Sequence, residues 1–102
     1  MNISDLMKQA QQFQENLASV QNDLGKQQVT GTAGAGMVTA TLNGRGELLT
    51  VSIEKTIVQP ENIEMLQDLI VAAVNDGLNK AKELGKAEMV KLTGGLNIPG
   101  LV

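Results

Sequence analysis

Reactive side chains are scarce in this chain of 102 residues. It contains no Cys, which excludes disulfides and thiolate metal sites. It contains no His, and so lacks both the commonest metal ligand and the side chain that titrates near neutral pH. Trp and Tyr are also absent and Phe13 is the single aromatic residue, so the core must consist of Leu, Ile, Val, Met and Ala.

The residues that could replace His and Cys in catalysis are poorly placed. Ser4, Ser19 and Ser52 have no base at a motif spacing. Glu61 and Glu64 have a structural explanation, because they fall in the first turn of an expected helix, where the helix dipole favours negative charge. We therefore expect no enzyme, no cofactor, no metal site and no small-molecule substrate.

Targeting and membrane signals are missing as well. The N-terminal stretch "MNISDLMKQAQQ" is polar and has no apolar signal core. No apolar run approaches the length that spans a bilayer, so we expect a soluble, intracellular protein with no membrane partner. The net charge of −3, from 8 basic and 11 acidic residues, argues mildly against nucleic acid, although the local clustering of positive charge matters more.

A heptad pattern predicts a helix over residues 4–24, with Ser4 suited to cap its start and Gly25 to end it. Its apolar stripe is narrow, which suits packing against another helix, with Phe13 buried in the seam. That helix could belong to the same chain, to a second copy or to another protein. The apolar positions, at alternating spacings of 3 and 4, are Ile3, Leu6, Ala10, Phe13, Leu17, Val20 and Leu24.

Residues 27 to 54 change to the period of β-strands, and the glycine clusters "GTAGAG" and "NGRG" interrupt them. A phosphate-binding loop would need a helix after the glycines, but strands follow both clusters. Two-residue type II′ turns centred on Gly34–Ala35 and Gly44–Arg45 place apolar residues opposite apolar residues. We therefore predict a three-stranded antiparallel meander, with strands over residues 27–33, 36–42 and 47–54.

The remaining apolar pattern predicts a long helix over residues 60–92. Pro60 suits its first position, and the apolar stripe is wide enough to cover the apolar face of the sheet. Gly77 allows close packing, and Gly85 marks an expected bend. Residues 93–102 predict a flexible tail, rich in Gly and with one Pro, that folding does not require.

The predicted fold is one α+β domain over residues 1–92, in the order helix, three strands, helix. Four stretches carry a resemblance to a known family, and they are "LMKQAQQFQ" (Leu6–Gln14), "VTGTAGAGMVTATLNGRGELLTVSI" (Val29–Ile53), "MLQDLIVAAVNDGLNKA" (Met65–Ala81) and "MVKLTGGLNIPG" (Met89–Gly100). With this order of elements the chain resembles the YbaB/EbfC family of bacterial nucleoid-associated proteins. The resemblance implies a tweezers-like homodimer that binds duplex DNA through its N-terminal and long C-terminal helices, with a role in chromosome organisation or transcription. It also implies a cytoplasmic location associated with the nucleoid.

The most basic stretch of the chain lies in the second half of the long helix. Lys80 has Asp76 at i,i+4 and Glu83 at i,i+3, so we expect it to form salt bridges within the helix. The polar stripe that continues through Asn79 ends in two further lysines. From the residues alone this stripe would be an ordinary solvated face, but the resemblance favours contact with DNA phosphates. The candidate contact residues on this helix are Asn79, Lys82 and Lys86.

On the first helix Lys8 is the one basic residue before the last turn, and Gln11 and Gln12 beside it can donate hydrogen bonds to phosphates or base edges. A neutral polar surface explains these residues equally well. Arg45 lies at a hairpin tip, where charge commonly serves solubility, and we leave it outside the candidate set. The alternative function is a protein-interaction module that uses the heptad helix, with weak or no DNA binding.

Overall fold

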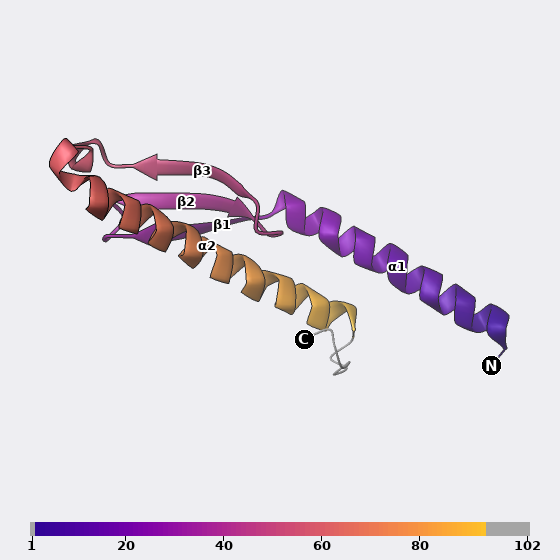
Figure 1. Cartoon of the computed structure of the whole chain (residues 1–102). Helices are drawn as coiled ribbons and strands as arrows, with labels where there is room; N and C mark the ends of the chain where they lie inside the picture. The colour runs from indigo at the N-terminus through magenta and orange to yellow at the C-terminus, as the bar shows by residue number, and fades with distance from the viewer. Residues whose placement is uncertain (1, 94–102) are drawn as a thin grey trace.

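The computed structural model describes residues 2–93 and confirms the α+β class with a three-stranded meander between two helices. The molecule is elongated, with extents of 69 × 22 × 16 Å. Figure 1 shows α2 lying along one face of the sheet, while α1 projects beyond the end of the sheet. The elements are α1 (Ile3–Lys26), β1 (Gln28–Ala33), β2 (Val38–Asn43), β3 (Leu48–Ile53), the 3-10 turns η1 (Lys55–Ile57) and η2 (Pro60–Asn62), and α2 (Ile63–Leu92).

The ends of three predicted segments differ from the structure or lie outside it. The cap of α1 is Asn2 and not Ser4, because the Asn2 side chain accepts a hydrogen bond from the backbone N–H of Asp5 at 2.8 Å. The helix also continues past Gly25 to Lys26. The long helix continues through Gly85. The predicted tail over residues 93–102 lies, apart from its first residue, outside the described residues, so its dispensability stays a prediction.

The first hairpin is shifted relative to the predicted register. The two residues at the centre of its turn are Ala35 and Gly36, one position later than predicted, and both have positive φ, of 55° and 90°. A positive φ at both central residues is the backbone of a type I′ turn and not of the predicted type II′ turn. The one-position shift moves the strand register by two residues, so Ala33, and not Gly31, lies opposite Val38. An even shift keeps every side chain on its predicted face.

The second hairpin has a longer turn than predicted and a bulge. Asn43 shapes the turn, since its side-chain oxygen accepts hydrogen bonds from the backbone N–H groups of Arg45 and Glu47, both at 3.0 Å. Gly46 then adopts a φ of 89°, which favours glycine. A register shift next to Leu42 places Leu48 opposite it, while Val51 lies opposite Ala40.

The helix α2 covers the apolar face of β1 and β2 by direct backbone contact. Gly31 of β1 and Gly77 of α2 are both buried, and a Cβ added to Gly31 would collide with the backbone of Ala73 and Gly77. A Cβ on Gly77 would collide with the side chain of Leu42. The prediction that Gly77 allows close packing is confirmed. The buried cluster under this contact consists of Val38, Ala40, Leu42, Ile57 and Ala73.

The outer edge of β1 is closed by two side chains of α2. Asp76 accepts a hydrogen bond from the backbone N–H of Thr32 at 3.0 Å, and Lys80 donates one to the carbonyl of Thr30 at 2.8 Å. Asp76 and Lys80 also form an ion pair at 3.3 Å. The Thr32 N–H and the Lys80 ammonium hold the pKa of Asp76 below its ordinary value of 3.8. An edge occupied in this way cannot pair with another strand.

We expect Gly77→Ala to destabilise the fold by about 1–3 kcal/mol, because the new methyl group displaces Leu42 and lifts α2 from the sheet. The matched control is Gly85→Ala in the same helix, where no atom lies within 4 Å of the new Cβ. That change should stabilise the protein by up to about 1 kcal/mol through helix propensity. Urea denaturation measures both, and equal shifts for the two variants would contradict a tight contact at Gly77.

The Asp76 contacts predict a pH dependence of stability. Because the pKa of folded Asp76 is depressed below 3.8, its stabilising effect is complete above that value and is lost as the pH falls through the folded pKa. The stability gap between wild type and Asp76→Asn should therefore shrink as the pH falls below about 4, since a protonated carboxyl resembles the amide. Thermal melting across this range measures the gap. Asp68→Asn, at an exposed site on α2, is the control. A stability difference between wild type and Asp76→Asn that does not change with pH would contradict the depressed pKa of Asp76.

Candidate nucleic-acid interface

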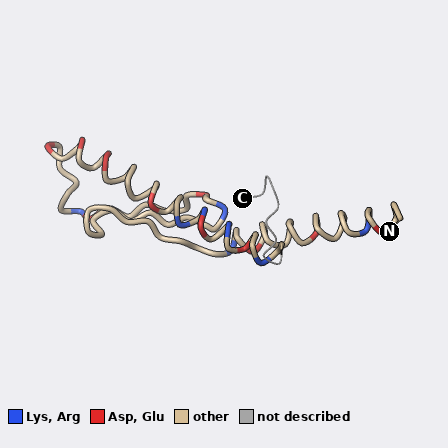
Figure 2. The backbone as a smooth tube through the Cα atoms, turned by 90° about the horizontal axis from the view of Figure 1, so that it is seen from below, with Lys and Arg blue, Asp and Glu red and all other residues tan. Residues whose placement is uncertain are grey.

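Charge is distributed unevenly along the molecule. Figure 2 shows most Lys and Arg in the middle, around the junction of α1 with the body, with Asp and Glu among them, whereas acidic residues dominate the far end where α2 begins. Between Lys55 and Lys80 the chain has four acidic residues and no basic one. The middle of the molecule is therefore less acidic than this end, and the cations that matter for a ligand are those without a strong acidic partner.

The predicted polar stripe of α2 lies on the outer surface of that helix. Asn75, Asn79, Lys82 and Lys86 are all exposed. Lys86 forms an ion pair with Glu83 at 3.7 Å, and both side chains are largely solvated, so the pair is weak. Within residues 2–93, Lys82 forms no ion pair. The stripe therefore offers one unpaired and one weakly paired cation on a helix face open to a ligand.

Lys80 is excluded from the stripe, as the sequence predicted. Its ion pair with Asp76 is confirmed at 3.3 Å. The predicted second pair with Glu83 is wrong, because Glu83 pairs with Lys86, while Lys80 reaches the carbonyl of Thr30 instead. The edge of β1 thus draws Lys80 away from Glu83. That partner was hidden from the sequence because it is 50 residues distant.

The candidate residues on α1 are exposed but lie apart from those on α2. Lys8, Gln11 and Gln12 belong to the part of α1 that projects from the body, and the amide of Gln12 donates to Asn16 at 3.2 Å. Lys8 lies 13 residues before Gln21, the α1 residue that shares a cleft with Lys82, and this is about 20 Å along the helix. The fold therefore creates two separate groups of candidate residues and not one cluster.

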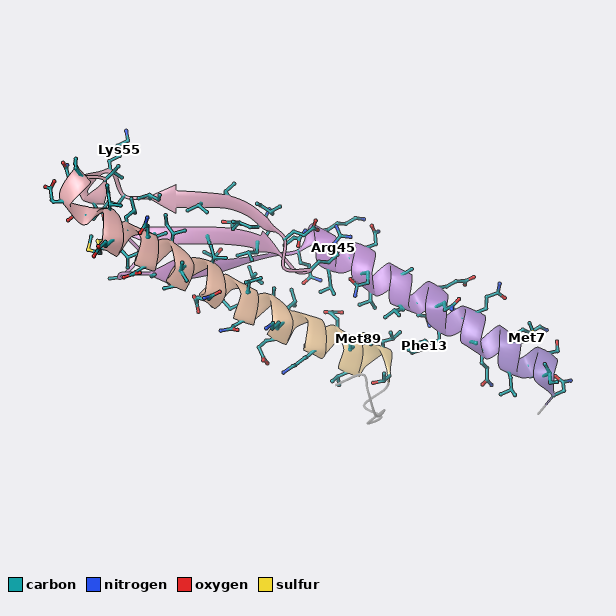
Figure 3. All side chains as sticks on the ribbon, viewed as in Figure 1. Met7, Phe13, Arg45, Lys55 and Met89 are labelled. Atoms are coloured by element: carbon teal, nitrogen blue, oxygen red, sulfur yellow. The ribbon has the colours of Figure 1, made fainter. Side chains whose placement is uncertain are left out.

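The heptad seam of α1 is only partly covered within the chain. Leu24 is buried and Leu17 and Val20 are half-buried, while Ile3 and Leu6 are 75% and 53% exposed. Figure 3 shows Phe13 on the side of α1 nearest the end of α2 that carries Met89. Phe13 is half-buried within the single chain, so its full burial in the seam stays a prediction that depends on a partner. The first heptad, beyond the end of α2, has no cover from the described residues.

The structure places Arg45 beside the α2 stripe, which the sequence analysis missed. Arg45, Lys82 and Gln21 line one cleft of about 300 Å³ where α1, the second hairpin and α2 meet. Glu47 holds the Arg45 side chain through its Nε at 3.1 Å and an Nη at 3.0 Å. The Asn43 amide and the Arg45 guanidinium hold the pKa of Glu47 below its ordinary value of 4.5. The turn signals predicted a tip at Arg45 without its neighbours, because these come from other elements.

Two classes of site are not found in the described part of the chain. No group of three or more potential metal ligands occurs among residues 2–93. No helix within that range combines the length and apolarity required to cross a bilayer.

Comparison with known proteins gives consistent matches over nearly the whole chain. The profile of the YbaB/EbfC DNA-binding family matches residues 1–96. A nucleoid-associated protein of Desulfotalea psychrophila is 52% identical over 101 residues, which span 99% of this chain and 95% of the relative. A nucleoid-associated protein of Clostridium novyi is 50% identical, with 99% and 89% covered. The crystal structure of the uncharacterized protein HP0035 of Helicobacter pylori superposes with a TM-score of 0.83 at 26% identity, over 92% of this chain and 99% of that one.

Proposed function

This chain belongs to the YbaB/EbfC DNA-binding family, and we propose that it binds duplex DNA as a homodimer through the exposed stripe of α2 and the polar face of α1. The observation that carries the proposal is the exposed stripe of α2, in which Lys82 forms no ion pair within residues 2–93 and Lys86 forms only a weak one. Phosphates provide most of the sequence-independent affinity for DNA, and local cations bind them whatever the net charge. The family is named for DNA binding and not for catalysis, while the absence of enzymatic activity stays a prediction.

The two groups of candidate residues have different roles in this proposal. Lys82 and Lys86 are the main phosphate contacts, with Asn79 as a further donor one turn earlier on α2. Lys8, Gln11 and Gln12 form the second contact region, about 20 Å away, so that α1 reaches a different part of the duplex. The candidate set contains three lysines and three side-chain amides in each subunit. Because so few cations contact phosphates, we expect the affinity for DNA to be modest.

The homodimer is supported by apolar surface that the described chain leaves uncovered. The β1 edge is closed by Asp76 and Lys80, whereas within residues 2–93 the outer edge of β3 receives no such contacts. Leu48 and Leu49 are each 48% exposed and Val51 is 37% exposed, next to this open edge. A small protein with a single aromatic residue gains stability from burying such a strip. We therefore place the dimer contact at β3.

The second candidate function is binding to another protein through α1. The exposed first heptad favours it, because Ile3, Leu6 and Met7 form an apolar surface beyond the end of α2. Such a seam specifies a helical partner. In either case we propose a cytoplasmic protein of the bacterial nucleoid with a role in chromosome organisation or transcription, as the names of its relatives suggest.

DNA binding should depend on salt to a degree set by a few lysines. Lys8, Lys82 and Lys86 make six candidate contacts in a dimer, of which four or five engage at once, so log affinity should fall with log salt at a slope of about −4 to −5. Replacing both Lys82 and Lys86 with Ala should flatten the slope by about 3–4 units, because it removes up to four contacts. Fluorescence anisotropy with a labelled duplex measures both values.

The control for the Lys82/Lys86 variant is Lys55→Ala. Figure 3 shows Lys55 at the end of the molecule where α2 begins, away from the junction of α1 with the body. The control should leave the slope unchanged. A wild-type affinity and slope in the Lys82/Lys86 variant would place the phosphate contacts elsewhere. If wild type itself does not bind duplex DNA at low salt, binding to another protein becomes the better assignment.

Val51→Lys should convert the dimer to a monomer of 10.8 kDa at micromolar concentration, because it places a charge in the apolar strip beside β3. Ser52→Lys is the matched control, since the neighbouring side chain points to the opposite, polar face of the sheet. Sedimentation equilibrium measures both masses. A wild-type mass of 10.8 kDa under the same conditions would rule out the homodimer.

A further inference from the structure

Three structural elements contribute polar side chains to the cleft at the α1–α2 junction. Gln21 comes from the end of α1, Arg45 from the tip of the second hairpin and Lys82 from the outer stripe of α2. Figure 3 shows Arg45 at the point where the sheet meets α1. These residues are separated by up to 61 positions in the sequence, and the fold brings them to one open volume of about 300 Å³.

The charges around the cleft leave positive potential available. Lys82 has no acidic partner within residues 2–93. The Arg45 guanidinium has five N–H donors, and Glu47 takes those of Nε and one Nη, so the others remain free. The Glu47 contact therefore holds the guanidinium in position without using all of its donors. The sum of the three charges, from Arg45, Lys82 and Glu47, is +1.

Glycines keep the cleft open, but they do not form a phosphate loop. A Cβ on Gly85 would meet no atom within 4 Å, so this wall of the cleft is unfilled. The backbone N–H groups of the hairpin are already used: Gly44 donates to the carbonyl of Leu24 at 2.8 Å, and Arg45 and Gly46 both donate to Asn43 at 3.0 Å. An anion in the cleft must therefore be held by side chains.

We propose that the cleft binds one backbone phosphate of duplex DNA, between the Lys82 ammonium and the Arg45 guanidinium, with the Gln21 amide as a third donor. This inference rests on the proposed function and adds two residues to it. A guanidinium paired with an ammonium suits a phosphate, because Arg offers directed donors and Lys a compact charge. A phosphate here also touches α1, the hairpin and α2 at once, so DNA would brace the projecting helix against the body.

The test measures duplex affinity for Arg45→Gln, Lys82→Gln and the double variant by fluorescence anisotropy over a range of salt. Each single change should weaken binding by about tenfold and, because it occurs in both subunits of the dimer, flatten the salt slope by up to about 2. Because both cations hold the same phosphate, the double variant should lose much less than the product of the two single losses. Lys55→Gln is the charge-matched control at the other end of the molecule and should bind as wild type.

The outcomes separate this inference from the proposed function. If wild type binds duplex DNA and both single variants bind it with the wild-type affinity, the cleft is not a DNA contact. The proposed DNA-binding function is unaffected by that outcome. Fully additive losses would assign the two side chains to different phosphates and overturn the shared site. If wild type fails to bind any duplex, both proposals fall. Thermal melting of every variant, with Arg45→Lys as a charge-conserving form that should retain most of the affinity, shows whether a loss reflects unfolding.

A last arm distinguishes a DNA phosphate from a free one. Inorganic phosphate at constant ionic strength should raise the melting temperature of wild type only slightly and equally in the double variant. A rise confined to wild type, with unchanged DNA affinity in the variants, would show that the cleft serves a small phosphorylated ligand and would overturn the DNA assignment.

Discussion

The contact between the backbones of Gly31 and Gly77 determines how the rest of this protein is built. Because neither residue has a side chain, α2 lies directly on β1, with Ala73 next to it and Leu42 beneath Gly77. This close approach brings Asp76 and Lys80 within hydrogen-bonding distance of the β1 edge. It also compensates for the scarcity of aromatic residues, since small side chains at short separation give dense packing where large side chains would otherwise fill a gap.

The same contact leaves the β3 edge of the sheet uncovered. A helix seated over β1 and β2 cannot also cover β3, and so the apolar residues of β3 remain half-exposed. One edge of the sheet is thus finished within the chain while the other is not. Closing one edge restricts strand pairing to the other, which is how a sheet protein directs its association. The position of α2 therefore links the packing of the monomer to the proposed dimer.

Patterns that depend on neighbouring residues were readable from the sequence, whereas contacts between distant elements were not. Alternating side chains predicted the three strands and their faces, and the structure confirms the meander. The registers were wrong by two residues in the first hairpin, because turn preferences alone do not distinguish Gly34–Ala35 from Ala35–Gly36 as the centre. The bulge at Leu42 was also missed, since it depends on how Asn43 organises the following turn. The shift in the first hairpin preserves the apolar face, which is the property that burial selects.

The candidate interface shows the same division. The exposure of Lys82 and Lys86 followed from helical periodicity, but the ion-pair partners depended on tertiary contacts. Lys80 is drawn to β1, which frees Glu83 to pair with Lys86, and Lys82 is left alone. Net charge was a poor guide because it also counts the four carboxylates at the end of the molecule where α2 begins, away from the junction, which are Glu54, Glu61, Glu64 and Asp68. At physiological ionic strength charges more than about 8 Å apart are largely screened, so a phosphate at the junction responds to Lys82 and Arg45 and hardly to the distant carboxylates. An acidic protein can in this way present individual exposed cations to DNA.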